Sequence, residues 1–300
     1  MKRLVALSFA AMASLAVAAC GLGADDEQWA GASENGANPL VYEITNAGGE
    51  IEGWMLGTIH ALPDGVSWRN DKTDAVIAQA DLLLVEVAEL DNQSEIALTF
   101  GELASTRGLG PLSERVSPEL REPLAKIVAR SDFPGGDFAD TESWAAAIIL
   151  ARVDATGEPR NGVDRALIRD FSDRDVRGFE TVAGQLGVFD TLDAADQRDL
   201  LEGTVREWVE AQEQPGRLLR AWLEGDEATL IEATTSGIMA DPELREALLV
   251  GRNENWIGPL VETLEKPERP LVAVGTAHLI GPDGLGAMLE KRGYSVCLMR

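Results

Sequence analysis

The stretches "GWMLGTIHALPDG" (Gly53–Gly65) and "AVGTAHLIGPDG" (Ala273–Gly284) each place Gly-Thr-x-His after an apolar run and follow it with Pro-Asp-Gly. Their histidines, His60 and His278, are the only two among the 300 residues of the chain. An apolar run that ends in Gly, Pro and Asp is typical of a buried strand followed by a turn. Because open α/β sheets bind ligands at the carboxyl ends of their strands, the repeated phrase predicts two strand ends that face one crevice.

The segments around these stretches alternate between strand and helix patterns. "LVYEI" and "IEGWMLGTI" flank the turn sequence "TNAGGE", which predicts a β-hairpin. "DLLLVEV" (Asp81–Val87) is a nearly continuous apolar run, as expected for a strand buried on both faces. The end of the chain returns to strand, helix and strand, whereas residues 94–168 and 193–266 have helical patterns. We therefore predict an α/β fold: a mixed central sheet with two related GxxH strand ends and long helical insertions.

The beginning of the chain has the features of an export signal. Two basic residues precede an apolar stretch too short to remain as a membrane span, and "VAAC" resembles the lipobox of bacterial lipoproteins. We expect residues 1–19 to be a lipoprotein signal peptide and Cys20 to be lipidated; the alternative is an ordinary secretory signal cleaved nearby. Residues 20–38 are small, polar and acidic and would form a flexible tether, with residues 39–300 as the domain.

This signal predicts an exported protein of the cell envelope that is held to a membrane by its lipid. Gly21, directly after the cysteine, is compatible with sorting to an outer membrane, with the domain facing the periplasm. Cys297 is then the only other cysteine, so we expect no intramolecular disulfide despite export.

The chain is strongly acidic, with 51 acidic and 26 basic residues and a formal net charge of −25. Such a charge disfavours binding to the phosphates of nucleic acids and electrostatic docking on anionic lipid. The acidic residues are dispersed rather than gathered in one tail, which indicates a solvated surface. We therefore expect a peptide or small-molecule substrate, no nucleic-acid partner, and membrane attachment only through the lipid anchor.

Four charged or polar positions raise the question of a site. Glu86 interrupts "LLLVEV"; a buried carboxylate there needs a metal, a cation or a hydrogen-bond donor, whereas on an edge strand it would face solvent. Glu180, in "RGFET", stands just past a shorter apolar strand pattern, so the need for a partner is less marked there. Arg252 and Asn253 lie at the predicted start of a helix, where they could hold a carboxylate or stabilise an oxyanion; the alternative is a surface salt bridge.

Histidines and carboxylates together suggest a catalytic metal site. An isolated histidine in a turn is most simply a hydrogen-bonded turn residue, but two such sites that hold every histidine favour function, because imidazole combines a near-neutral pKa with good metal ligation. Two histidines with one or two carboxylates fit a transition-metal site with an open water position, which is suited to hydrolysis. The sequence contains no HExxH, GxSxG or Walker A motif and no GxGxxG after a strand.

An ordered set of motifs resembles the TraB/PrgY/GumN superfamily, which includes the Tiki metalloproteases. The set consists of Gly57-Thr-Ile-His60, the strand that carries Glu86, and Gly275-Thr-Ala-His278. The GumN-like bacterial branch is resembled further by "NGVD" (Asn161–Asp164), "GFETVAGQL", "RNENW" and the last segment, so that the resemblance covers residues 40–300. It implies an α/β core, a metal-dependent hydrolase with peptide cleavage, and a core site of His60, Glu86 and His278 with Arg252 and Asn253 as neighbours.

The leading hypothesis is an envelope-anchored, metal-dependent hydrolase of peptides. His60, His278 and Glu86 would bind a divalent ion such as Mn²⁺, Co²⁺ or Zn²⁺, and Arg252 would orient the substrate, with Glu180 as a supporting acid. Glu86 would otherwise be the general base on the metal-bound water. Two alternatives remain open: a non-catalytic module that captures a peptide or small ligand in the same crevice, and a metal-independent hydrolase with histidine as general base.

Overall fold

A computed structural model describes residues 37–133 and 138–300 of the chain. Its centre is a six-stranded sheet with the strand order β4-β3-β5-β2-β1-β6. The strands are β1 (Val41–Thr45), β2 (Ile51–Thr58), β3 (Leu82–Val87), β4 (Asp175–Glu180), β5 (Pro270–Gly275) and β6 (Ser295–Leu298). β4, β3, β5 and β2 are parallel, whereas β1 pairs antiparallel with both β2 and β6. The predicted mixed α/β sheet is confirmed.

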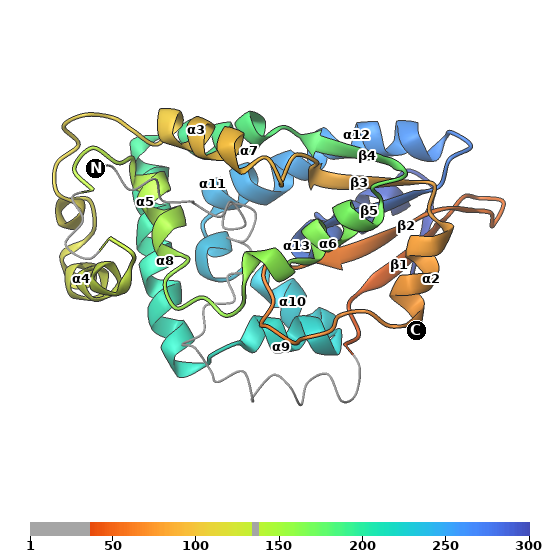
Figure 1. The fold of residues 1–300 in the computed structure, drawn as a ribbon, viewed down its shortest axis with the longest axis horizontal. Coiled ribbons are helices and arrows are strands. Elements are labelled where there is room, and N and C mark those ends of the chain that lie inside the picture. The colour runs from red at the N-terminus through yellow and green to blue at the C-terminus, as the bar shows by residue number, and fades with distance from the viewer. Residues whose placement is uncertain (1–36, 134–137) are drawn as a thin grey trace.

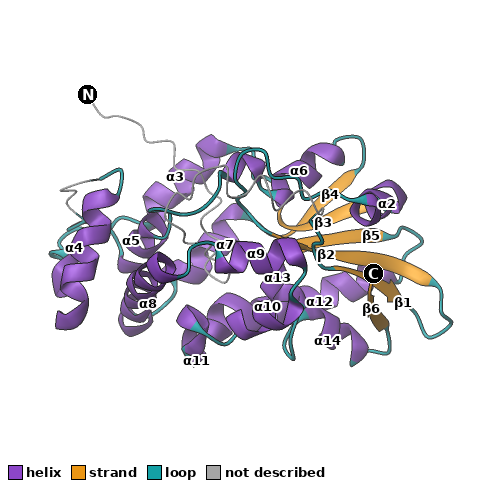
Figure 2. Cartoon of the chain, turned by 90° about the horizontal axis from the view of Figure 1, so that it is seen from below, coloured by secondary structure: helices purple, strands orange, loops and turns teal. Residues whose placement is uncertain are grey.

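Helices cover both faces of the parallel part of the sheet. Figure 2 shows α2 (Asp71–Gln79) and α6 (Val163–Asp170) on one side, and α12 (Gly251–Leu264) and α14 (Leu285–Glu290) on the other. Every residue of β3 and β5 is buried, which explains their nearly continuous apolar sequences. The predicted hairpin of β1 and β2 is also confirmed; the Asn46 side chain organises its turn by accepting hydrogen bonds from the amides of Gly48 and Glu50.

The long insertions form a second, helical part beside the sheet (Figure 1). Its hydrophobic core is separate from the core around the strands, and Trp144 lies fully buried between Phe100 and Phe189 at ring distances of 5.5 and 6.1 Å. The remaining helices are α3 (Gln93–Leu103), α4 (Arg121–Arg130), α5 (Ser143–Leu150), α7 (Val182–Asp190), α8 (Ala194–Glu213), α9 (Arg217–Glu224), α10 (Glu227–Ala233), α11 (Pro242–Arg245) and α13 (Thr276–Leu279).

The two Gly-Thr-x-His phrases lie side by side but are not in register. β2 and β5 are neighbours, and Gly57 pairs with Val274 while Thr58 pairs with Gly275. The chain also passes very close here, because a Cβ atom at Gly57 would lie 2.6 Å from the hydroxyl of Thr276. After β5 the second phrase forms the helical turn α13 before it reaches the predicted Pro-Asp-Gly turn. The copies are therefore offset by one residue and continue differently.

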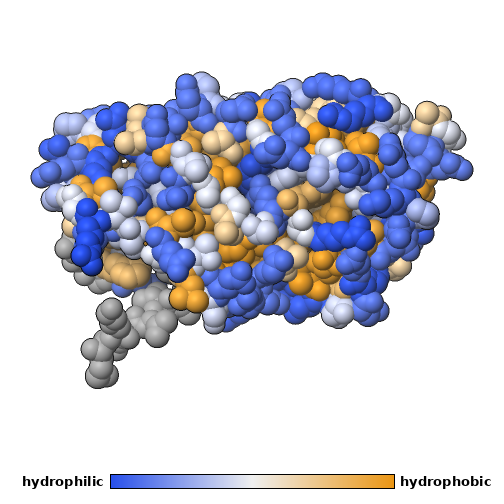
Figure 3. Space-filling model, turned by 90° about the horizontal axis from the view of Figure 1, so that it is seen from above, coloured by the Kyte–Doolittle hydropathy of each residue, from blue (hydrophilic) through white to orange (hydrophobic). Residues whose placement is uncertain are grey.

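The predicted signal peptide and Cys20 lie outside the described residues. The last two residues assigned to the tether are ordered against the domain: Ala37 is buried, and the amide of Asn38 donates a hydrogen bond to the carbonyl of Leu223 at 2.7 Å. Within the described part of the chain, no helix combines the length and the apolar character that crossing a membrane requires. Figure 3 shows a mostly hydrophilic face on which hydrophobic side chains form separate patches.

Glu207 on α8 links stability to pH. Its carboxylate accepts a hydrogen bond from the amide of Ile238 at 2.9 Å, and burial raises its pKa to about 7, helped by Glu210. The folded pKa lies above the unfolded value, so the folded state binds the extra proton and stability falls as pH rises from about 4.5 through 7. The wild type should therefore lose about 1–2 kcal/mol more unfolding free energy than Glu207→Gln when the pH is raised from 5 to 8.

Urea denaturation at the two pH values measures this difference. Glu213→Gln, an exposed position at the end of the same helix, is the matched control and should change stability by less than about 0.5 kcal/mol. Equal pH dependence in the wild type and in Glu207→Gln would contradict the assignment.

Candidate functional site

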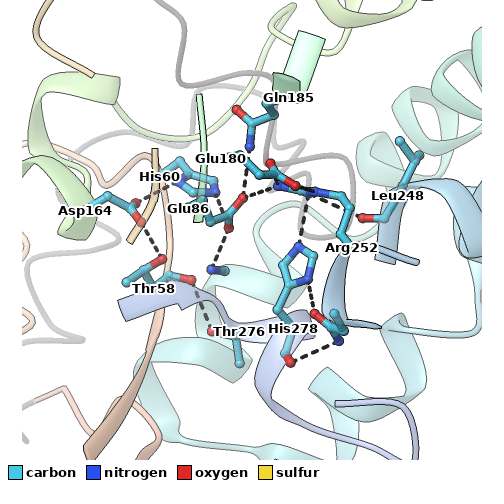
Figure 4. Close-up of polar contacts among 12 residues, drawn as sticks. Thr58, His60, Glu86, Asp164, Glu180, Gln185, Leu248, Arg252, Thr276 and His278 are labelled. Atoms are coloured by element: carbon cyan, nitrogen blue, oxygen red, sulfur yellow. Dashed lines mark hydrogen bonds and ion pairs between the residues drawn. The ribbon is translucent and has the colours of Figure 1, made fainter. Parts of the chain in front are cut away.

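The carboxyl ends of β2, β3, β4 and β5 bring the predicted site residues together (Figure 4). His60 follows β2, Glu86 lies near the end of β3, Glu180 is the last residue of β4, and His278 follows β5 in α13. Side chains from sequence positions more than 200 residues apart thus lie in one cluster, as expected for the carboxyl edge of parallel strands. Arg252, from α12, reaches into the same cluster.

His60 is held by a buried aspartate from α6. The Nδ1 atom of His60 lies 2.6 Å from one carboxylate oxygen of Asp164, whose other oxygen accepts a hydrogen bond from the hydroxyl of Thr58 at 2.7 Å. Because an ionised carboxylate only accepts hydrogen bonds, Nδ1 of His60 carries the proton. A Cβ atom at Gly162 would overlap the His60 carbonyl, so this glycine lets α6 approach closely.

The other ring nitrogen of His60, Nε2, is buried without a hydrogen-bond partner and lies 3.9 Å from Oε1 of Glu86. Burial disfavours a charge on this ring, but the carboxylates of Asp164 and Glu86 outweigh burial and raise the pKa of His60 to about 9. Below about pH 9 the ring is therefore an imidazolium with a proton on each nitrogen, and above that pH the neutral ring, protonated at Nδ1, presents a strongly basic Nε2 to the site.

Glu86 is a buried carboxylate with three hydrogen-bond donors, not an exposed side chain of an edge strand. Its Oε1 accepts from the amide of Gly275 at 2.8 Å, and its Oε2 accepts from Gln185 at 3.0 Å and from Arg252 at 2.8 Å. Burial alone would raise its pKa, but Arg252 and the two histidines hold the pKa at about 2. A Cβ atom at Gly275 would lie 3.1 Å from Oε1 of Glu86, so glycine keeps this contact open.

Arg252 makes a two-pronged salt bridge with Glu180. Its Nε and Nη2 atoms donate to the two carboxylate oxygens of Glu180 at 2.9 and 2.8 Å, and the indole of Trp256 donates to the same carboxylate at 3.1 Å. The Arg252 side chain is only 7% exposed, which rules out a surface salt bridge. Arg252 is the second residue of α12, as predicted, but α12 follows α11 and a π-helical turn (Glu246–Val250) without a break, so there is no free helix N-terminus at Arg252.

His278 accepts a hydrogen bond from Arg252 and is fixed by Asn253. The amide nitrogen of Asn253 donates to the carbonyls of His278 and Asp283 at 3.2 and 2.8 Å, so its oxygen faces Nδ1 of His278 at 2.7 Å. Nδ1 therefore carries the proton, and Nε2 accepts from Nη1 of Arg252 at 3.2 Å. Burial and the nearby guanidinium lower the pKa of His278 to about 3, which keeps the ring neutral.

The family model described as "TraB/PrgY/gumN family" matches residues 40–297. The chain belongs to this family. No curated protein and no solved structure matches the chain. Every side chain of the cluster described above lies within the matched segment of the TraB/PrgY/gumN domain.

The two phrase histidines of this TraB/PrgY/gumN domain have different surroundings. Both ring nitrogens of His278 are engaged, whereas His60 keeps Nε2 free. Asn253 is likewise occupied by His278 and the Asp283 carbonyl, so in this arrangement it orients His278. Sequence reasoning brought His60, Glu86 and His278 together but assigned no role to Asp164.

Gln185 is a second residue that sequence reasoning missed. It is buried on α7, one turn after Glu180 ends β4, and its amide donates to Glu86. Both Gln185 and Asp164 lie within the motifs that carried the resemblance, "GFETVAGQL" and "NGVD". A polar side chain on the buried face of a helix that follows a site strand is the signal that could have identified Gln185.

The metal expected from the resemblance can be tested against the donor set. His60 and Glu86 have atoms 3.9 Å apart that could share a ligand, but Nε2 of His278 faces the guanidinium of Arg252. A divalent ion about 4 Å from that guanidinium would meet a repulsion of about 8 kcal/mol at an effective dielectric constant of 20. Among residues 37–133 and 138–300, no group of three or more His, Cys, Asp or Glu could hold a metal ion. The three expected ligands do not fit one ion in this arrangement.

The two rings can be followed separately, because the chain has only two histidines. We expect the imidazole of His60 to titrate near pH 9 and that of His278 to stay neutral down to about pH 3 in NMR titrations of the ring nuclei. Asp164→Asn should lower the pKa of His60 by one unit or more, because it removes the nearest carboxylate.

Asp170→Asn, near the other end of α6, is the matched control and should leave both titrations unchanged. The described arrangement would be wrong if both rings titrated together near their ordinary pKa of about 6.5.

Proposed function

We propose that this TraB/PrgY/gumN domain is a hydrolase in which His60 is the general base. The observation that carries the proposal is the free Nε2 atom of His60, buried and without a partner, on a ring whose other nitrogen is held by Asp164. A buried imidazole held by a carboxylate in this way is the arrangement that proton transfer in hydrolysis requires. Buried polar atoms in proteins are nearly always paired, and this one faces the charged side chains of the cluster, where a water molecule or a substrate would bond to it.

The residues of the site support one sequence of steps. Neutral His60 takes a proton from a water molecule at Nε2 while that water attacks the carbonyl carbon of the substrate. The carboxylates of Asp164 and Glu86 stabilise the imidazolium that forms, as their effect on the pKa of His60 indicates. The imidazolium then donates its proton to the leaving amine or alcohol, and the bond to the leaving group breaks. His60 returns to its neutral form and the products are a carboxylic acid and an amine or alcohol.

The other members of the cluster hold the charges in place. Glu86 keeps a fixed position because Gly275, Gln185 and Arg252 donate hydrogen bonds to it. His278 keeps the guanidinium of Arg252 aligned from the opposite side. Fixed charges in a site with little water act strongly on a transition state because they need not reorganise during the reaction.

Peptides are the proposed substrates, as the resemblance to the Tiki branch implies. Peptide and ester libraries with mass-spectrometric detection of cleavage test this. His60→Ala should lower kcat/KM by about 10²–10⁴-fold, the usual contribution of a general base. Asp170→Asn, on α6 but outside the cluster, should retain wild-type activity. Because neutral His60 is the active form, the rate should rise with pH and level off above about 9.

Three outcomes distinguish the alternatives. Binding of library members without cleavage would indicate a non-catalytic module. Activity that a chelator abolishes and that Mn²⁺, Co²⁺ or Zn²⁺ restores would favour the metal-dependent reaction. Full activity in His60→Ala would overturn the general-base proposal.

We also propose that the domain is exported and held at a membrane by a lipid on Cys20, based on the signal sequence and the lipobox. Mass spectrometry of protein expressed in a Gram-negative host should detect cleavage before Cys20 and an acylated cysteine. Cys20→Ser should release the protein from the membrane fraction, whereas Cys297→Ser, which changes the exposed cysteine of β6, should not. An unmodified Cys20 would contradict the anchor.

A further inference from the structure

We infer that Arg252 is a resident cation in this site and takes the place of a divalent metal ion. The inference goes beyond the proposed function, because it concerns which cation the cluster holds and stands whether or not the domain hydrolyses a substrate. It rests on the groups that surround the guanidinium.

Three potential metal ligands converge on this one guanidinium. Nη2 of Arg252 lies 2.8 Å from Oε2 of Glu86 and 2.8 Å from Oε2 of Glu180, and Nη1 lies 3.2 Å from Nε2 of His278. Two carboxylates and a neutral imidazole are a common donor set for Mn²⁺, Co²⁺ or Zn²⁺. The carboxylate oxygens would need to move by only about 0.7 Å each to reach a metal at the position of Nη2, whereas His278, which faces Nη1, would need to move further.

The guanidinium uses every one of its N–H groups. The N–H of Nε and one N–H of Nη2 donate to Glu180, and the other N–H of Nη2 donates to Glu86. The two N–H groups of Nη1 donate to His278 and, at 3.4 Å, to the carbonyl of Leu248. No N–H group of Arg252 is left to bind a substrate oxygen directly. This saturation is typical of a structural cation rather than of a residue waiting for a ligand.

The fold places Arg252 in the cluster and keeps it there. The π-helical turn Glu246–Val250 directly precedes α12, and such turns change the direction in which the following side chains point. The guanidinium also stacks over the ring of Trp256 at 4.7 Å, and the same indole donates a hydrogen bond to Glu180. Backbone, aromatic and acidic neighbours therefore hold one orientation of Arg252.

Guanidinium and metal ion exclude each other for electrostatic and steric reasons. Both would occupy the space between the same two carboxylates, and a divalent ion beside the guanidinium would be repelled by it. If Arg252 is replaced by a small neutral residue, Glu86 and Glu180 remain as two buried carboxylates without their cation. Such carboxylates bind a divalent ion readily, because an uncompensated buried charge is costly.

Metal binding by the purified domain tests the inference with CoCl2 as the probe. Arg252→Ala should bind one equivalent of Co²⁺ at least tenfold more tightly than the wild type in calorimetry, develop the visible absorption bands of histidine-ligated Co²⁺, and gain thermal stability when Co²⁺ is added. Arg252→Lys, which keeps the charge, should behave like the wild type. Arg245→Ala is the matched control: Arg245 lies on α11, which is continuous with α12, and its side chain donates a hydrogen bond to Asp283.

Further variants show where the ion binds. Glu180→Gln or His278→Ala, each added to Arg252→Ala, should abolish the new Co²⁺ site, whereas weak binding to the acidic surface should persist. If Arg252→Ala does not fold, Arg252→Gln removes the charge while keeping an amide donor and is tested in the same way.

Two results would overturn the inference. One is a wild-type domain that binds one equivalent of Co²⁺ and loses it in His278→Ala. The other is a folded neutral variant at position 252 that gains no Co²⁺ binding. Neither result depends on turnover, so failure of this inference is distinguishable from failure of the proposed hydrolysis.

Discussion

The cost of burying the Glu86 carboxylate organises the whole site. A buried charge is tolerated only with donors and a counter-charge, and removing one partner of such a pair typically costs about 3–5 kcal/mol. Glu86 therefore draws the Gly275 amide from β5, Gln185 from α7 and Arg252 from α12 to the end of β3. One acidic residue in an apolar strand thus links the sheet to α7 and α12, two helices of the segment between β4 and β5.

Each partner of Glu86 creates a further requirement. The buried guanidinium of Arg252 has more donors than Glu86 can satisfy, so Glu180 and His278 complete its hydrogen bonds. His278 in turn needs a fixed ring orientation, which Asn253 supplies. Asn253 is itself buried, and both its amide nitrogen and its oxygen are hydrogen-bonded, which makes this side of the cluster rigid.

The repeated phrase supplies two histidines with unequal roles. The one-residue offset between β2 and β5 and the helical turn α13 give the two rings different neighbours. His278 becomes a fully bonded part of the Arg252 cluster, while His60, oriented by Asp164, retains the one free ring nitrogen. Similar sequence at two strand ends therefore produced one supporting and one available imidazole.

The sequence by itself determined the strands, the hairpin and the meeting of His60, Glu86 and His278, because hydrophobic periodicity and the carboxyl-edge rule for parallel strands act locally or through simple topology. It did not reveal the roles of Asp164 and Gln185 or the saturation of Arg252. Only the tertiary structure decided these, because hydrogen bonds between side chains about 100 residues or more apart depend on helix orientation, and a π-helical turn and a one-residue register offset leave no clear trace in composition or spacing.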